Sequence, residues 1–148
     1  VTPALARTLH HELVHAAFDA GAPSLVLPAW LNEGVAEWFE ARSAGQPPVS
    51  ASEYDALARI GAAGGLLPIA ALSRPSFAGL DAEAAPLAYL QARALVDHVT
   101  RTRGDAALRA LLVRLLRTGD LERSLVRATG LGVEGLEASL RAELGLAR

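Results

Sequence analysis

The chain has 148 residues and a formal net charge of −2, and 51% of its residues are hydrophobic. This length accommodates one ordinary domain, and the apolar content is sufficient for a packed core, which excludes a disordered chain. The small net charge gives no electrostatic reason to expect a nucleic-acid partner. Cys, Met and Lys are all absent, which excludes disulfides, thiolate nucleophiles, Cys-ligated zinc, Schiff-base chemistry and a P-loop.

Because even an initiator Met is missing, we expect the chain to be a processed product or a part of a longer protein. No uninterrupted apolar run reaches the length of a membrane span, so no membrane segment is expected in this chain. We predict one domain over residues 1–148, with active-site helices over about 3–41 and a helical C-terminal part over about 50–148.

Apolar residues recur at helical spacing almost everywhere, and no segment alternates convincingly with period two, so the sequence predicts a mainly α fold. The predicted elements, in chain order, are helices over about 3–20 and 28–41, a helix from a capping box at 50–53 to about 61–65, one turn over 68–72, and helices over 86–103, 105–118, 120–129 and 133–144. Residues 24–27 form a short apolar stretch that is either a loop or a brief strand. The segment 74–81, rich in Pro, Ser and Gly, is predicted to be a loop.

A metal-ligand motif lies within the first predicted helix. The segment 11–15, His-Glu-Leu-Val-His, has the H-E-x-x-H pattern. The i, i+4 spacing places the imidazoles of His11 and His15 on one helix face, where both can bind a single zinc ion at about 2.0–2.1 Å. Glu12 lies about 100° further round the helix. From there it reaches the open side of the metal, where a general base for a water molecule belongs.

A catalytic zinc site needs a third protein ligand, and the second predicted helix offers Glu33 and Glu37. Seventeen residues separate His15 from Glu33, enough for the chain to finish the first helix and return antiparallel. Gly34 removes a side chain where the two helices approach, so we predict that Glu33 is the third ligand. Glu37, one turn on, is predicted to accept a hydrogen bond from the non-coordinating nitrogen of a histidine ligand. The alternative for both is an exposed helix carboxylate.

The other polar candidates give less specific signals. His10 cannot share the face of the two histidine ligands and is assigned to the surface or to their surroundings. His98 is assigned a structural role. No Ser, His and Asp arrangement indicates a serine hydrolase, and no Gly-rich phosphate loop is present.

These motifs resemble those of the gluzincin metallopeptidases, in particular the aminopeptidase N family and the peptidase MA-like domains related to it. The resemblance rests on the H-E-x-x-H motif of 11–15 followed by Trp-Leu-Asn-Glu-Gly-x-Ala over 30–36. It implies a zincin-like helical fold, Glu33 as the third zinc ligand, and peptide or protein substrates. The spacing between His15 and Glu33 is one residue shorter than the aminopeptidases usually have, which suits the looser peptidase MA-like group better.

The resemblance extends to residues 87–96, which are similar to a family segment in which a Tyr opens a helix. In the aminopeptidases that Tyr donates a hydrogen bond to the tetrahedral intermediate, so the resemblance implies this role for Tyr89. A phenol is a reasonable oxyanion donor where a metal already polarises the carbonyl. The neighbours differ, since Leu-Gln-Ala at 90–92 stands where the family has Glu-Lys-Gly. The alternative is that Tyr89 packs its ring at a helix start.

Family members also place a β-sheet before the H-E-x-x-H helix, and its edge strand holds the substrate by strand addition. Only ten residues precede His11, so we expect that sheet to be missing from this chain. The sequence therefore predicts a zinc-dependent metallopeptidase with a helical fold. Two alternatives stay open: a catalytically inactive, zinc-stabilised helical binding module, and a helical interaction domain in which the motif is coincidental and no metal binds.

Overall fold

The computed structural model describes residues 2–146, and every regular element in that range is a helix. The helices are, in chain order, α1 (Pro3–Gly21), α2 (Ala29–Ser43), α3 (Ala51–Ala62), α4 (Ile69–Leu72), α5 (Ala84–Arg103), α6 (Asp105–Thr118), α7 (Leu121–Thr129) and α8 (Val133–Glu143). The mainly α prediction is thus confirmed. None of the described helices combines the length and apolar composition that crossing a bilayer requires.

Local capping signals explain where several helices begin and end. Ser50 accepts a hydrogen bond from the Glu53 amide, and the Glu53 carboxylate accepts one from the Ser50 amide. This reciprocal pair confirms the capping box predicted at the start of α3. Gly119 and Gly130, which follow α6 and α7, have φ angles of 69° and 81°. Glycine adopts this left-handed conformation without a Cβ penalty, so each of the two residues can end the helix before it.

The structure corrects the start of one predicted helix and decides between the two alternatives for residues 24–27. Helix α5 begins at Ala84, two residues before the predicted start, because the Asp81 carboxylate accepts hydrogen bonds from the amides of Glu83 and Ala84. Residues 24–27 form turn and irregular backbone, so of the two open alternatives the structure has the loop.

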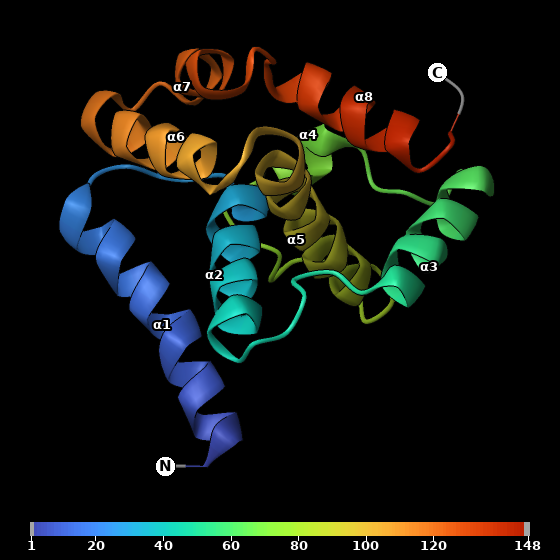
Figure 1. The fold of residues 1–148 in the computed structure, drawn as a ribbon, viewed down its shortest axis with the longest axis horizontal. Coiled ribbons are helices and arrows are strands. Elements are labelled where there is room, and N and C mark those ends of the chain that lie inside the picture. The colour runs from blue at the N-terminus through green and yellow to red at the C-terminus, as the bar shows by residue number, and fades with distance from the viewer. Residues whose placement is uncertain (1, 147–148) are drawn as a thin grey trace.

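Helix α5 lies at the centre of the molecule (Figure 1) and contacts α2, α3, α6 and α8. Helix α2 packs along α5, and α1 packs chiefly against the other side of α2. Helices α6, α7 and α8 follow one another across the top of the view, while α3 lies on the side remote from α1. The fully or nearly fully buried side chains of α2 and α5 form the centre of the core: Trp30, Leu31, Ala92, Leu95, Val96 and Val99.

The closest approach between α2 and α5 occurs at Gly34. A Cβ atom added there would lie 2.5 Å from the Ala92 carbonyl oxygen, and real Cβ atoms essentially never come so close. The missing side chain therefore accommodates α5, whereas the sequence analysis assigned this close approach to the first helix. As a result, the helix that carries Tyr89 passes directly beside the segment of α2 that carries Glu33.

One face of α1 remains uncovered in the described structure. Leu5, Leu9 and Leu13 recur every four residues, and their exposed fractions are 50%, 53% and 60%. This spacing places the three leucines on a single face of the helix. The contacts of α1 with the rest of the fold are thus concentrated on the face toward α2.

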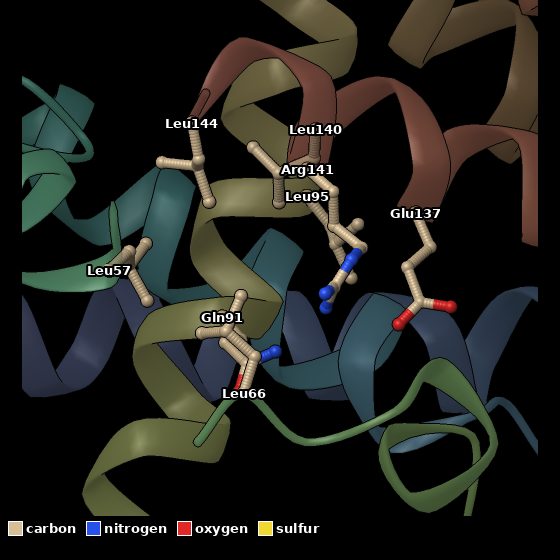
Figure 2. Close-up of a pocket in the computed structure, with 8 residues that line it drawn as sticks. All are labelled: Leu57, Leu66, Gln91, Leu95, Glu137, Leu140, Arg141 and Leu144. Carbon is tan, nitrogen blue, oxygen red and sulfur yellow. The ribbon is translucent and has the colours of Figure 1, made fainter. Parts of the chain in front are cut away.

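A small apolar hollow between α3, α5 and α8 belongs to the core. It is surrounded by leucine side chains from these three helices and their flanks (Figure 2): Leu57, Leu66, Leu95, Leu140 and Leu144. Its volume is about 10 Å³, close to the smallest space that holds one water molecule. Gln91, which also lines it, donates to the Leu67 carbonyl and accepts from the Leu67 amide. The hollow is too small to bind a ligand, and the side-chain amide of Gln91 already has both of its partners in the backbone of Leu67.

Candidate metal centre

The three predicted ligands converge between α1 and α2. One ligand atom each from His11, His15 and Glu33 lies within 4.8 Å of the other two. The Glu33 Oε2 atom is 3.5 Å from His11 Nε2 and 3.7 Å from His15 Nε2. Ligand atoms around a tetrahedral zinc ion, with bonds of about 2.0–2.1 Å, lie about 3.3–3.5 Å apart. The two distances at Glu33 are close to this separation.

The outer ring nitrogens of both histidines have partners on α2. His15 Nδ1 lies 2.9 Å from Asn32 Oδ1, and His11 Nδ1 lies 3.4 Å from Glu40 Oε2. An amide oxygen can only accept a hydrogen bond, so His15 Nδ1 donates to Asn32. In a neutral imidazole the proton on Nδ1 leaves a lone pair on Nε2, and Nε2 of His15 lies 3.7 Å from Glu33 Oε2. The contact of His11 with Glu40 is an ion-pair contact and not a hydrogen bond.

The centre brings two imidazole nitrogens and a carboxylate oxygen close together. No hydrogen bond joins His11, His15 and Glu33 within residues 2–146, although their nearest atoms are 3.5 and 3.7 Å apart. The three side chains are only 19%, 23% and 20% exposed, so solvent hydrates them only in part. A cation bound between them would satisfy all three. Two imidazoles and one carboxylate form a donor set typical of catalytic zinc.

Glu37 has a different partner from the one predicted. Its carboxylate lies 3.5 Å from Arg93 Nη1 on α5, and no hydrogen bond joins it to either histidine in the described structure. The predicted hydrogen bond to a histidine is formed instead by Asn32 with His15, while Glu40 lies 3.4 Å from His11 Nδ1. Helix geometry explains the correction: seven residues after Glu33, Glu40 lies only about 20° from it around the helix, whereas Glu37 is rotated by about 40° to the opposite side, toward α5. Burial raises the pKa of Glu37 above its ordinary value, although Arg93 opposes this shift.

Glu12 lies on α1 next to His11, and its side chain is exposed. Among the described residues it forms no hydrogen bond or ion pair, so its carboxylate is not engaged by another side chain.

Tyr89 lies in the second turn of α5, whereas the resembling family segment has its Tyr at the opening of a helix. Its ring packs edge-on against Phe77 at a centroid distance of 5.2 Å. Burial and the negative charges of Glu33 and Glu37 raise the pKa of the Tyr89 phenol above its ordinary value. The phenol therefore keeps its proton at neutral pH. Since its hydroxyl has no hydrogen-bond partner within residues 2–146, it is available to donate to a bound molecule.

The sequence analysis missed Asn32 and Glu40 as partners of the ligands. A signal for Glu40 existed, because a spacing of seven residues from Glu33 returns to nearly the same helix face. No comparable signal pointed to Asn32, whose contact depends on how α1 lies against α2. His10, assigned to the surface or the ligand surroundings, contacts Ser43 Oγ at 2.8 Å and no metal ligand.

Replacing Asn32 with alanine should weaken zinc binding by about 10–100-fold, because His15 loses the acceptor that fixes its tautomer and ring orientation. Competition with a chromogenic chelator would measure the affinity. Asn32→Asp retains an acceptor oxygen at this position and should restore most of it. Equal affinities of the wild type and Asn32→Ala would show that the Asn32 contact does not orient the ligand.

No family model, curated protein or solved structure matches this chain. The interpretation of the centre thus rests on its motif, its distances and the chemistry of its donors.

Proposed function

We propose that the chain is a zinc-dependent metallopeptidase of the gluzincin type with a zincin-like helical fold. The observation that carries the proposal is the convergence of His11 Nε2, His15 Nε2 and a Glu33 oxygen in a little-exposed site between α1 and α2. No hydrogen bond joins these three side chains to one another in residues 2–146, and a cation between them would be bound by all three.

The residues present fit zinc in number, type and spacing. His11, His15 and Glu33 would hold the ion, while Asn32 and Glu40 would hold the imidazoles in position. Three protein ligands leave one position of a tetrahedral ion for a water molecule or substrate. When bound, zinc supplies Lewis-acid activation of water and of the scissile carbonyl.

The chain's own residues then carry the proton transfers. The Glu12 carboxylate removes a proton from water as the water oxygen attacks the carbonyl carbon, and it delivers that proton to the amine nitrogen as the C–N bond breaks. The Tyr89 hydroxyl donates a hydrogen bond to the developing oxyanion, where a fixed donor lowers the barrier. Its raised pKa supports this role, because a phenolate could not donate.

The surface beside the centre supports a substrate with side chains. A recess of about 210 Å³ is lined by Glu40, which contacts His11, and by Glu37, Glu53, Arg7 and Arg93. Glu37 and Glu53 both pair with Arg93, and Glu40 pairs with Arg7, so the recess carries charges of both signs with one carboxylate in excess. A recess of this kind suits one side chain of a peptide.

The decisive experiment measures zinc in the purified chain and cleavage of a mixed peptide library. We expect about one zinc ion per chain and cleavage that a chelator abolishes and added zinc restores. Cleavage that persists at full rate after the metal has been removed would contradict the proposal, as would a chain that binds no zinc at micromolar concentrations.

A second candidate is a non-catalytic module in which zinc has a structural role. The observation in its favour is that the ligands come from both α1 and α2, while α1 packs chiefly against α2. An ion at this position would tie the N-terminal helix to the core. Stoichiometric zinc together with no cleavage of any peptide in the library would favour this candidate.

A further inference from the structure

A buried histidine lies between a serine and a carboxylate on the other side of the molecule. His98 of α5 places Nε2 at 2.8 Å from Ser139 Oγ and Nδ1 at 2.5 Å from a Glu143 oxygen, both on α8. The His98 side chain is only 4% exposed. The carboxylate accepts from Nδ1, which leaves Nε2 as the acceptor for the serine hydroxyl. This order, from carboxylate to imidazole to hydroxyl, is the one by which a histidine activates a serine nucleophile.

The carboxylate of this chain of hydrogen bonds is itself held in place. One Glu143 oxygen contacts His98, and the other accepts a hydrogen bond from the Arg101 guanidinium. Burial opposes ionisation of Glu143, but the hydrogen bonds from Arg101 and His98 outweigh it and hold the pKa of this carboxyl below its ordinary value. Asp97, the neighbour of His98 on α5, accepts hydrogen bonds from Tyr54 and Arg101 instead. Glu143 therefore remains an ionised acceptor that fixes the imidazole.

The serine, unlike the histidine, reaches a surface groove. Ser139 is partly exposed and lines a groove of about 540 Å³ along α8. Its lining combines small or apolar side chains, among them Leu131, Ala138, Ala142 and Leu146, with the charged side chains of Glu134, Glu137 and Arg141. A molecule in this groove would lie against Ser139, whereas His98 is not part of the lining. The apolar part of the groove suits a small, uncharged acyl group.

We infer that Ser139 is a nucleophilic serine that accepts an acyl group from small activated esters, independently of any metal. In this reaction the Ser139 Oγ forms a bond to the acyl carbon, and its proton passes to His98 Nε2. The bond between the acyl carbon and the leaving oxygen then breaks, and the leaving oxygen takes that proton. Water can later hydrolyse the acyl-serine by the same route.

The position of Ser139 within a helix also limits the rate of the reaction. Ser139 lies inside α8, where backbone amides are used by the helix and are not free to bind an oxyanion. Losing such donors costs about 100–1,000-fold in rate. A good leaving group offsets this cost in the acylation step but not in the hydrolysis of the acyl-serine. The acyl group is therefore expected to accumulate on Ser139 and to turn over slowly.

The test uses p-nitrophenyl acetate on the full chain in the presence of a chelator. Trypsin should release the peptide 128–141, which contains Ser139 as its only serine, and fragmentation should place one acetyl group on that residue. The absence of Lys removes the main source of background acetylation. We expect labelling of Ser139 to be lost in Ser139→Ala and to be slowed at least about ten-fold in Glu143→Gln and about 100-fold in His98→Gln.

Ser43 provides a matched control. Its hydroxyl also contacts a histidine, His10, at 2.8 Å, but it donates its proton to the Glu40 carbonyl. Ser43→Ala should leave the labelling of Ser139 unchanged. If His98→Gln does not fold, the near-isosteric Glu143→Gln decides. No acetyl group on peptide 128–141 of the wild type, or equal labelling rates in the wild type and folded Glu143→Gln, would overturn the inference.

Discussion

Replacing Glu33 with alanine should remove zinc from the protein. The Glu33 oxygen is the atom that lies near both histidine nitrogens, at 3.5 and 3.7 Å, so its loss leaves two imidazoles from adjacent turns of α1 as the only ligands. We expect the affinity to fall by more than about 100-fold, since even the loss of an outer partner costs about 10–100-fold. Elemental analysis after gel filtration and a chelator competition would measure the change.

The control for this prediction lies one turn away on the same helix. Glu37→Gln removes a negative charge close to the centre, but the structure pairs Glu37 with Arg93 and not with a ligand. It should therefore keep a zinc affinity within a few-fold of the wild type. Full zinc retention by Glu33→Ala would contradict the ligand assignment, and zinc loss from Glu37→Gln would show that the corrected role of Glu37 is wrong.

Replacing Glu12 with glutamine should abolish peptide hydrolysis while zinc remains bound. The substitution keeps the size of the side chain but removes the base that accepts the proton from water, and such a loss costs about 100–10,000-fold in rate. Because the Glu12 side chain is exposed and has no partner in the described structure, neither folding nor zinc content should change. Initial rates on one library-derived peptide, with zinc measured in the same samples, would test this.

Asp19→Asn is the matched control for Glu12→Gln, because it removes a charge from an exposed carboxylate of the same helix. Its hydrolysis rate should equal that of the wild type. A Glu12→Gln variant that still cleaves peptides at an unchanged rate would exclude Glu12 as the general base. Loss of activity in both variants would point to the charge of α1 and not to one catalytic carboxylate.

The helices could be predicted from the sequence because their signals are local. The Ser50 capping box and the glycines after α6 and α7 act within a few residues of each helix end, so composition and spacing reveal them. The early start of α5 was missed because it depends on the Asp81 side chain, three residues before Ala84. The Asp81 carboxylate accepts hydrogen bonds from the amides of Glu83 and Ala84, and the helix therefore begins before Pro86.

The candidate site was predictable as far as it depends on spacing within one helix. The i, i+4 interval places His11 and His15 on one face whatever surrounds them. The role of Glu37 could not be decided in this way, because Glu37 and Glu40 both lie near the Glu33 face and only the packing of α1 and α5 against α2 separates them. The contact of His98 with Ser139 could not be predicted for the same reason, since Ser139 lies 41 positions after His98 and no local pattern connects them.

The proposed zinc site would link the docking of α1 to the binding of the ion. Since two of the candidate ligands lie on α1 and one on α2, zinc would bind with full affinity only when α1 is docked, and its binding would favour docking by the same free energy. At a free zinc concentration 100 times the dissociation constant, this linkage adds about 2.7 kcal/mol to the docked state. The concentration of free zinc would then determine what fraction of the molecules has α1 docked on α2, and with it how often this helix and its exposed leucines separate from the rest of the fold.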